Sequence, residues 1–309
     1  MKIYVAGHRG LVGSAIVRAI EGSDEHTWIG QTRKELDLLD RSAVFEYVKN
    51  EKPDWVVIAA AKVGGIHANS TYPVEFLSEN LQIETNLIDA CHAADIDRVL
   101  FLGSSCIYPK NCPQPIKEEY LLTGPLEPTN EAYALAKISG LKLIEAYRKQ
   151  YGHDWISAMP TNLYGPGDNY DLENSHVLPA LIRKFHEAKI SAAGGVSLWG
   201  SGSPRREFLH ADDLAAACLH LLGNYHDAVA LNIGTGQDIT IRELAELIAE
   251  TVGFSGGITW DESKPDGTHR KQLDVSAAFS NGWSASISLA EGVARTYASY
   301  LGAASSSSR

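Results

Sequence analysis

Short apolar runs alternate along this chain with longer segments in which hydrophobic residues recur every three or four positions. Such alternation is typical of parallel strands connected by helices. We expect strands at residues 2–6, 27–31, 54–60, 98–104 and 155–161, with 230–236 returning to the same sheet. We expect helices at residues 11–21, 41–50, 73–94, 130–151, 175–189, 212–223, 240–252 and 286–301. The pattern therefore predicts an α/β protein with a doubly wound parallel sheet.

The regular alternation breaks down after about Tyr164, where glycine and proline interrupt the pattern more often. Both residues favour turns over long regular elements. We therefore predict a first domain at residues 1–164, completed by the returning strand at 230–236. A smaller, interleaved C-terminal domain at residues 165–309 is expected to bind the substrate.

A glycine-rich turn joins the first predicted strand to the first predicted helix. Gly7 permits the tight turn, Gly10 lets backbone N–H groups approach a pyrophosphate, and Gly13 lets the helix pack on the sheet. The segment expected to hold a dinucleotide comprises Gly7, His8, Arg9, Gly10, Leu11, Val12 and Gly13. An ordinary strand–turn–helix is the alternative, but the place at the start of an α/β pattern favours a Rossmann-type cofactor site.

Two arginines bear on which nicotinamide cofactor binds. Chains that bind NAD usually carry an acidic residue about 20 residues beyond the loop, where it holds the ribose 2′-hydroxyl. This chain has Arg33 there and Arg9 within the loop, and two guanidinium groups suit a 2′-phosphate. A solvated strand end is the alternative, and Glu35 weakens the positive field. The balance favours NADP(H), with Asp37 and Leu38 placed to contact the adenine.

Composition narrows the classes of partner and the compartment. The 309 residues are 44% hydrophobic, enough for a sizeable core, and the formal net charge is −11. An acidic chain is a poor partner for nucleic acid or an anionic membrane surface. No apolar stretch approaches the about 18 residues of a membrane span, and a core strand begins the chain, which argues against a signal peptide. Four cysteines without zinc-ligand spacing predict reduced thiols, no metal site and a cytoplasmic protein.

Tyr133 and Lys137 stand four residues apart on a predicted helix, so their side chains share one face. There the ammonium should lower the pKa of the phenol. Ser104 ends a central strand, at the edge where open α/β sheets hold ligands. If the extended geometry continues, Ser104 and Cys106 point to one side and Ser105 to the other. Ser104 and Tyr133 would then donate hydrogen bonds to one carbonyl oxygen.

Cys106 and His176 are candidates for moving protons to and from carbon. A free cysteine is more often a small buried hydrophobe, but Cys106 lies beside Ser104. Thiols and imidazoles titrate near neutral pH and can serve as base and acid. His176 follows a turn expected to line the cleft, and Asn174 or Ser175 is expected to cap the helix that follows.

Several blocks of this sequence resemble the GDP-L-fucose synthases, within the extended short-chain dehydrogenase/reductase family. The glycine loop and the Tyr-x-x-x-Lys spacing fit the same family, so the likeness covers nearly the whole chain. The blocks are Ala59-Ala-Ala-Lys-Val-Gly-Gly-Ile66, Gly103-Ser-Ser-Cys-Ile-Tyr-Pro109, Glu127-Pro-Thr-Asn130, Met159-Pro-Thr-Asn-Leu-Tyr-Gly-Pro166, Asn174-Ser-His-Val177, Arg206-Glu-Phe-Leu-His210 and Lys264-Pro-Asp-Gly-Thr268. The family epimerises C3 and C5 of GDP-4-keto-6-deoxy-D-mannose and then reduces C4 with NADPH, which gives GDP-L-fucose.

The resemblance implies a role for each candidate residue. It makes Ser104, Tyr133 and Lys137 the reductase triad, and Cys106 and His176 the acid and base of epimerisation. Further cofactor contacts are implied at Lys137, Pro160, Thr161, Asn162, Leu163 and His176. Substrate contacts are implied at Lys184, Trp199, Arg206 and Asp266. Lys184 departs from an arginine that is common in the family, and a lysine does not make the same bidentate phosphate contact.

Two other interpretations fit part of the pattern. Another nucleotide-sugar epimerase or reductase would share the fold, but a pure 4-reductase would not need Cys106 and His176. A related dehydratase would usually carry an Asp-Glu pair where this chain has Ser105 and Cys106. A non-catalytic NADP(H) sensor could dispense with the Tyr–Lys pair.

The segments 73–94 and 130–151 carry apolar residues beyond one core-facing stripe. These residues are Phe76, Leu77, Leu81, Ile83, Leu87, Ile88, Leu135, Ile138, Leu141, Leu143, Ile144 and Tyr147. Two such helices from each subunit could form a four-helix interface, so we expect a homodimer. The alternative is that both helices only cover the sheet.

Overall fold

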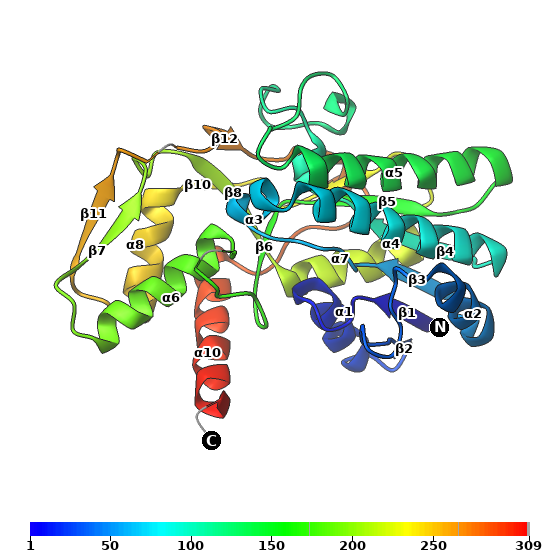
Figure 1. Cartoon of the computed structure of the whole chain (residues 1–309), viewed down its shortest axis with the longest axis horizontal. Helices are drawn as coiled ribbons and strands as arrows, with labels where there is room; N and C mark the ends of the chain where they lie inside the picture. Colours follow the sequence, from blue (N-terminus) through cyan, green and yellow to red (C-terminus); the bar gives the residue numbers. More distant parts are fainter. Residues whose placement is uncertain (173, 265, 308–309) are drawn as a thin grey trace.

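A six-stranded parallel sheet forms the centre of the computed structural model, which describes residues 1–172, 174–264 and 266–307 (Figure 1). In spatial order its strands are β2 (Thr27–Ile29), β1 (Lys2–Ala6), β3 (Trp55–Ile58), β4 (Arg98–Leu102), β5 (Ile156–Pro160) and β9 (Leu231–Ile233). The sheet winds outward from β1 in both directions, as the doubly wound prediction requires. The late strand β9 pairs with β5, so the expected return of the chain to this sheet is confirmed.

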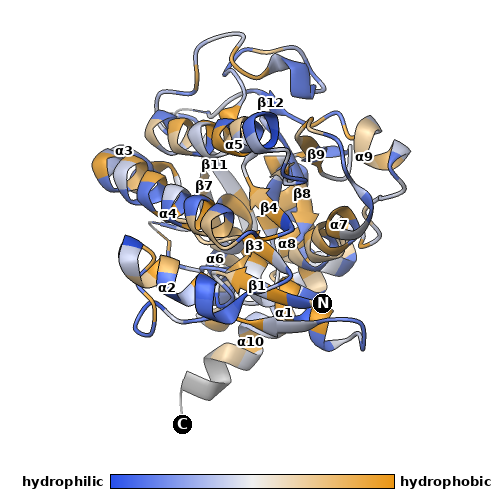
Figure 2. Cartoon of the chain, turned by 90° about the vertical axis from the view of Figure 1, so that its right-hand side faces the viewer, coloured by the Kyte–Doolittle hydropathy of each residue, from blue (hydrophilic) through white to orange (hydrophobic). Residues whose placement is uncertain are grey.

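Helices cover both faces of this sheet. One face carries α1 (Leu11–Glu21) and α7 (Ala211–Asn224), and the other carries α2 (Arg41–Glu51), α4 (Pro73–Ala93) and α5 (Glu131–Tyr151). Figure 2 shows the apolar central strands enclosed between these layers. Because parallel strands share one direction, the carboxyl ends of β1, β4 and β5 lie along a single edge.

A second layer of structure is built around β8 (Arg205–His210). Its partners are β6 (Asn162–Tyr164), β10 (Asp238–Thr240) and β12 (Arg270–Lys271). A two-stranded sheet, β7 (Gly195–Trp199) with β11 (Gly257–Asp261), lies in the same part of the chain. Here α6 (Val177–Ile190), α8 (Ile241–Val252) and α10 (Leu289–Ser307) share a separate apolar core. The remaining short elements are α3 (Ile66–Thr71), η1 (Ser105–Ile107), η2 (Glu118–Tyr120) and α9 (Ser276–Ser280).

The hydrophobic pattern predicted the long helices and the central strands. Several predicted strands were a few residues too long, whereas the predicted helix at 286–301 ended before the observed end of α10. It missed β6, β7, β8, β10, β11 and β12, because these strands are short and most of them pair with distant segments. Among the described residues, no helix is both long enough and apolar enough to cross a membrane.

Candidate active site

The turn after β1 has a geometry that requires glycine. Gly7 has a φ of +88°, and a Cβ on it would lie 2.8 Å from the Cα of Ala60. A Cβ on Gly13 would lie 2.1 Å from the Gly7 carbonyl oxygen, so Gly13 lets α1 approach the loop, whereas we expected contact with the sheet. The N–H of Gly10, the N-cap of α1, donates to that same carbonyl at 2.9 Å. The first N–H groups of α1 have no partner within the helix and suit a pyrophosphate.

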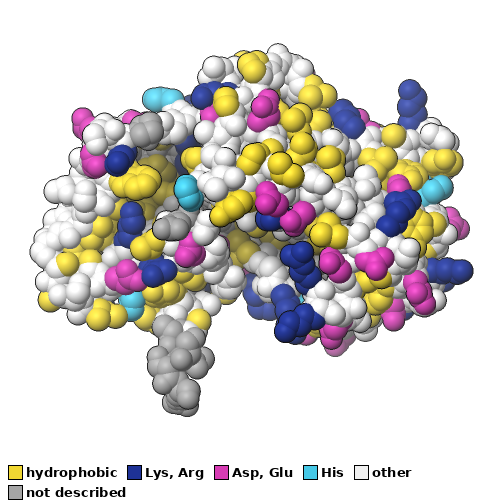
Figure 3. All heavy atoms as spheres, in the orientation of Figure 1, with side chains coloured by type: hydrophobic (Ala, Val, Ile, Leu, Met, Phe, Trp, Pro, Cys, Tyr) yellow, Lys and Arg dark blue, Asp and Glu magenta, His cyan; other side chains and the backbone are white. Residues whose placement is uncertain are grey.

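The predicted 2′-phosphate residues are exposed beside this loop. Arg33 lies in the turn after β2, which ends earlier than the sequence pattern predicted. Glu35 is an acidic residue close to Arg9. Its pKa lies below the usual value, first because Thr32 donates hydrogen bonds to it, one of them from the backbone N–H at 2.8 Å, and then because of the charge of Arg9. Figure 3 shows Lys and Arg side chains grouped next to α1 on this face.

Three neighbouring residues differ in exposure. The His8 imidazole packs beside the Trp28 ring, with 5.6 Å between centroids, and burial lowers its pKa. Leu38 packs partly against the core, whereas Asp37 is exposed and accepts a hydrogen bond from the N–H of Leu39. Of the two residues expected near the adenine, Leu38 therefore offers the apolar surface.

Ser104, Cys106 and Tyr133 meet at the carboxyl edge of the sheet. Ser104 and Cys106 both lie close enough to the Tyr133 phenol to affect its pKa. The chain does not continue as a strand here: β4 ends at Leu102, and η1 follows with the Cys106 N–H donating to Ser104 Oγ at 3.2 Å. The extended geometry assumed for this segment was therefore wrong, but the expected division of the side chains holds, because η1 buries Ser105 and leaves Ser104 and Cys106 partly accessible.

Lys137 does not act on Tyr133 as expected. Its ammonium lies 3.0 Å from the Leu102 carbonyl oxygen and 3.1 Å from Glu84 Oε1, but 6.0 Å from the centre of the Tyr133 ring. The pKa of Tyr133 is raised, first because burial disfavours the phenolate and then because Cys106 and Glu84 contribute negative charge. The predicted fall in that pKa was wrong, because burial of the phenol raises it and Glu84 offsets the charge of Lys137.

Lys271 contacts Cys106 and acts electrostatically on His176, the two candidate proton carriers. Its ammonium donates to Cys106 Sγ at 3.5 Å. The pKa of His176 is lowered, first by the protein atoms around the ring and then by the charge of Lys271, although the residue stays accessible to solvent. Lys271 reaches this position because β12 pairs in parallel with β8, opposite Arg206. Sequence reasoning missed it, since a single lysine in a loop looks like any solvated charge.

A close backbone contact places His176 at the sheet edge. The N–H of Gly65 donates to the Asn174 carbonyl at 2.9 Å, and a Cβ on Gly65 would lie 2.9 Å from the Ser175 carbonyl oxygen. His176 itself occupies the N-cap position of α6, without a side-chain cap. The expected cap by Asn174 or Ser175 was wrong, because both residues belong to a turn that precedes the helix. In this turn Asp171 accepts hydrogen bonds from the backbone N–H groups of Asn174 and Ser175.

The segment after β5 runs along the same edge. Pro160 ends β5, and Leu163 belongs to the short strand β6 that pairs with β8. Between them, the side chains of Thr161 and Asn162 donate to the Glu207 carbonyl oxygen at 3.3 and 2.8 Å. These four residues therefore form the boundary between the central sheet and β8.

The predicted substrate residues gather around the end of β7. Trp199 is 72% exposed, and the ammonium groups of Lys184 and Lys264 lie 5.9 and 5.6 Å from its ring centroids. Burial lowers the pKa of Lys184. Arg206 lies close enough to Asp266 for their charges to interact. An exposed indole beside several cations suits a nucleotide with phosphates, and Lys264 is the member of this group that sequence reasoning missed.

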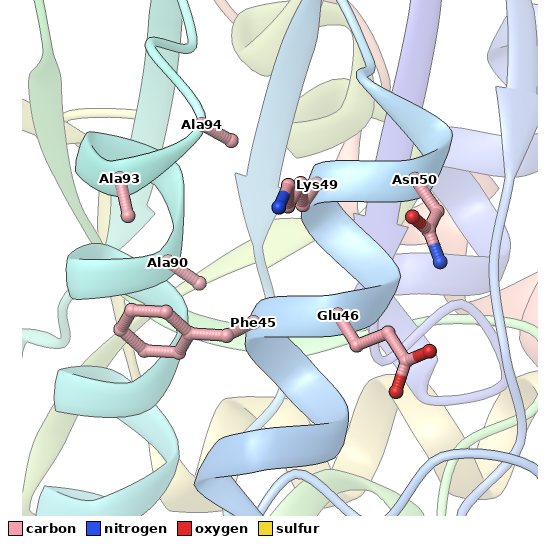
Figure 4. Close-up of a pocket in the computed structure, with 7 residues that line it drawn as sticks. All are labelled: Phe45, Glu46, Lys49, Asn50, Ala90, Ala93 and Ala94. Carbon is pink, nitrogen blue, oxygen red and sulfur yellow. The ribbon is translucent and has the colours of Figure 1, made fainter.

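A surface groove between α2 and α4 is separate from these residues. It is lined by Phe45, Glu46, Lys49, Asn50, Ala90, Ala93 and Ala94. Figure 4 shows Phe45 extending from α2 toward the alanines of α4. None of the candidate site residues lines this groove, so the carboxyl edge of the sheet stays the candidate active site.

Comparison with known proteins identifies the family of the chain. Residues 3–234 match the NAD dependent epimerase/dehydratase family. GDP-L-fucose synthase 1 of Arabidopsis thaliana is 58% identical, with 97% of this chain and 93% of that protein covered. GDP-L-fucose synthase of Escherichia coli is 53% identical, with 97% and 96% covered.

A solved structure extends this comparison to three dimensions. The GDP-L-fucose synthetase of Naegleria fowleri bound to NADP is 26% identical, covers 98% of this chain and 95% of its own, and superposes with a TM-score of 0.90. The sequence match and the shared fold lead to one assignment. The chain belongs to the NAD dependent epimerase/dehydratase family, and within it to the GDP-L-fucose synthases.

Proposed function

We propose that this chain converts GDP-4-keto-6-deoxy-D-mannose to GDP-L-fucose, by epimerisation at C3 and C5 and NADPH-dependent reduction at C4. One observation carries the proposal: two chemically different groups of residues meet at one sheet edge. Ser104 and Tyr133 suit a ketone oxygen, whereas Cys106 and His176, linked by Lys271, suit proton transfer at carbon. A simple reductase has no use for the second group.

The residues around the glycine turn fit a nicotinamide dinucleotide. A Cβ at Gly7 or Gly13 would fill the loop, and the first turn of α1 offers backbone N–H groups to the pyrophosphate. Arg9 and Arg33 would hold the 2′-phosphate of NADP(H). When bound, NADPH supplies the hydride that C4 accepts.

Ser104 and Tyr133 carry out the proton chemistry of the reduction. Both hydroxyls donate hydrogen bonds to the C4 ketone oxygen and stabilise the negative charge that develops there. As C4 becomes an alcohol, the Tyr133 O–H bond breaks and its proton passes to that oxygen. Lys137 lies 6.0 Å from the centre of the phenol ring and stays in its ion pair with Glu84.

Epimerisation uses the same ketone. C3 and C5 are both bonded to C4, so removing a proton from either carbon gives an enolate that Ser104 and Tyr133 stabilise. Inversion requires one group to take a proton from one face and another group to return a proton on the opposite face. Cys106 and His176 fill these roles, and Lys271 supplies positive charge beside the sulfur when the thiolate acts as base.

The GDP portion would be held around β7. Trp199 offers an exposed ring, while Lys184, Arg206 and Asp266 offer charged contacts to the nucleotide. Lys264 lies beside the same indole and supplies a second ammonium near Lys184. This pair would compensate for the guanidinium that Lys184 replaces.

Exchange of solvent deuterium into C3 and C5, followed by NMR without reduction, separates the two chemistries. Cys106→Ser should lose most of this exchange, because a hydroxyl is a much weaker acid than a thiol and gives little of the basic form at neutral pH. His176→Gln should do likewise. Tyr133→Phe should retain slower exchange but lose NADPH oxidation, because the proton donor to the C4 oxygen is gone.

The result for Cys106→Ser decides the assignment of the thiol. If this variant exchanges both protons at the wild-type rate, Cys106 is structural. If it still reduces a ketone supplied already epimerised, the two activities are separable as proposed. Wild-type protein that binds NADPH but does not oxidise it with this substrate would contradict the function as a whole.

The proposal extends to assembly and compartment. α4 and α5 lie side by side, and each keeps apolar side chains that its own core does not bury, including Leu135, which is 42% exposed. These support a homodimer through the two helices. The four cysteines are free thiols, which supports a reducing, cytoplasmic location.

A further inference from the structure

Glu84, on α4, carries a buried carboxyl group that the proposed mechanism does not use. Its side chain is 1% exposed, and Oε1 lies 3.1 Å from Nζ of Lys137, whose side chain is 3% exposed. Within the described part of the chain, its carboxyl oxygens have no other hydrogen-bonding partner. Burial raises the pKa of the Glu84 carboxyl, whereas Lys137 acts to lower it, so the carboxylate depends on this ammonium.

Helix α5 provides space for this carboxyl group. Gly140 lies one turn beyond Lys137 on the same face of the helix. A Cβ on Gly140 would lie 2.7 Å from Glu84 Oε2 and 2.4 Å from Cζ of Phe101. Glycine is unfavourable inside a helix, so its presence here indicates that the space matters.

The charge of Glu84 also reaches the catalytic phenol. It is one of the causes that raise the pKa of Tyr133, after burial and Cys106. The Lys137 ammonium would act in the opposite direction, but it is held between Glu84 and the Leu102 carbonyl. The pair thus presents little net positive charge to Tyr133.

The groups around this pair come from four elements. Titratable groups are Glu84 from α4, Tyr133 and Lys137 from α5, and Cys106 from η1. β4 contributes the Phe101 ring, 4.8 Å from the ammonium, and the Leu102 carbonyl, neither of which titrates. Glu84 is therefore the group whose charge opposes Lys137.

We propose that Glu84 is a positioning residue for the reduction, because it fixes Lys137 and offsets its charge so that Tyr133 stays a protonated donor. The inference rests on the proposed reduction at C4. An unopposed ammonium would favour the phenolate, which has no proton to give to the ketone oxygen.

Glu84→Gln tests this inference, because the amide keeps the size of the side chain and an oxygen for Lys137 but removes the charge. We expect the alkaline limb of kcat/KM for NADPH oxidation to move to lower pH by about one unit, the low end of what a neighbouring charge causes. The limb moves to lower pH because the negative charge of Glu84 raises the pKa of Tyr133, and the amide removes that charge. Glu84→Asp keeps the charge and should keep the limb near its wild-type position.

A matched control lies on the same helix. Glu79 pairs with Lys62 at 3.1 Å and is outside the groups assigned to catalysis, so Glu79→Gln should leave the alkaline limb in place. An unmoved limb in Glu84→Gln, or an equal shift in both variants, would overturn the proposal.

A second measurement needs no substrate. The melting temperatures of Glu84→Gln, Lys137→Met and the double variant form a thermodynamic cycle. We expect the double variant to lose less than the sum of the single losses, because it leaves no unpaired buried charge. Additive losses would refute the pairing. This cycle tests the pairing of Glu84 with Lys137 even if the wild-type protein does not turn over the keto sugar. Such a failure of turnover would contradict the proposed function and not the pairing.

Discussion

Arg9 and Arg33 are the residues through which the chain would distinguish NADPH from NADH. Both are exposed, and each charge-assisted bond to a 2′-phosphate is worth about 1.5–3 kcal/mol, or roughly one to two decades in affinity. We expect the double variant Arg9→Ala, Arg33→Ala to bind NADPH much more weakly and NADH almost as well as wild type.

Fluorescence titration with each cofactor gives the two dissociation constants. Arg18→Ala is the control, because Arg18 is an exposed residue of α1 that pairs with Asp212 at 2.6 Å. Equal losses for both cofactors would show that the arginines serve the loop, where Arg9 already faces Glu35.

At the scale of elements, the packing of α5 against α4 depends on Gly140. An alanine inside a helix is usually more stable than glycine by about 0.5–1 kcal/mol. At this position we expect the opposite, a loss of about 1–3 kcal/mol, because the new methyl group would meet Phe101 and Glu84. Thermal unfolding of Gly140→Ala measures the change.

Gly223, near the end of α7, offers a matched comparison. A Cβ there meets no atom within 4 Å, so Gly223→Ala should leave the melting temperature unchanged or raise it slightly. If Gly140→Ala raised the melting temperature as well, the space beside Glu84 would have no structural importance.

At the scale of the whole molecule, α4 and α5 decide whether two chains associate. Some of the additional apolar residues that the sequence showed on these helices belong to the core, since Phe76, Leu87 and Leu141 are buried. Leu135 remains exposed, and several neighbours on the two helices are half-buried. Light scattering at micromolar concentration should give twice the chain mass of 33.5 kDa.

A charge at the proposed interface should separate the subunits. We expect Leu135→Glu to give the mass of a single chain, because a buried unpaired carboxylate opposes association. Leu172→Glu changes an equally exposed leucine outside the two helices and should leave the mass of the dimer. A monomeric wild type would contradict the homodimer.

Local patterns determined much of this protein from the sequence alone. The strand, the turn at Gly7 and the helix that follows depend on neighbouring residues, so hydrophobic period and turn chemistry predicted them. The shared face of Tyr133 and Lys137 follows from helical spacing. The long helices were predicted for the same reason, whereas the return of β9 to the central sheet was expected from the alternation of strands and helices along the whole chain.

Contacts between distant segments were decided only by the tertiary structure. The turn after Leu102 replaced the expected strand because η1 packs against α5. Lys271 reaches Cys106 through the pairing of β12 with β8, 165 residues along the chain from the thiol. Glu84 meets Lys137 only where α4 crosses α5, and the pKa of Tyr133 is raised first by burial and then by the charges of Cys106 and Glu84, against the prediction. The burial of a side chain and the charges around it depend on which segments meet in space. A pattern of residues along one chain does not show which distant segments will meet.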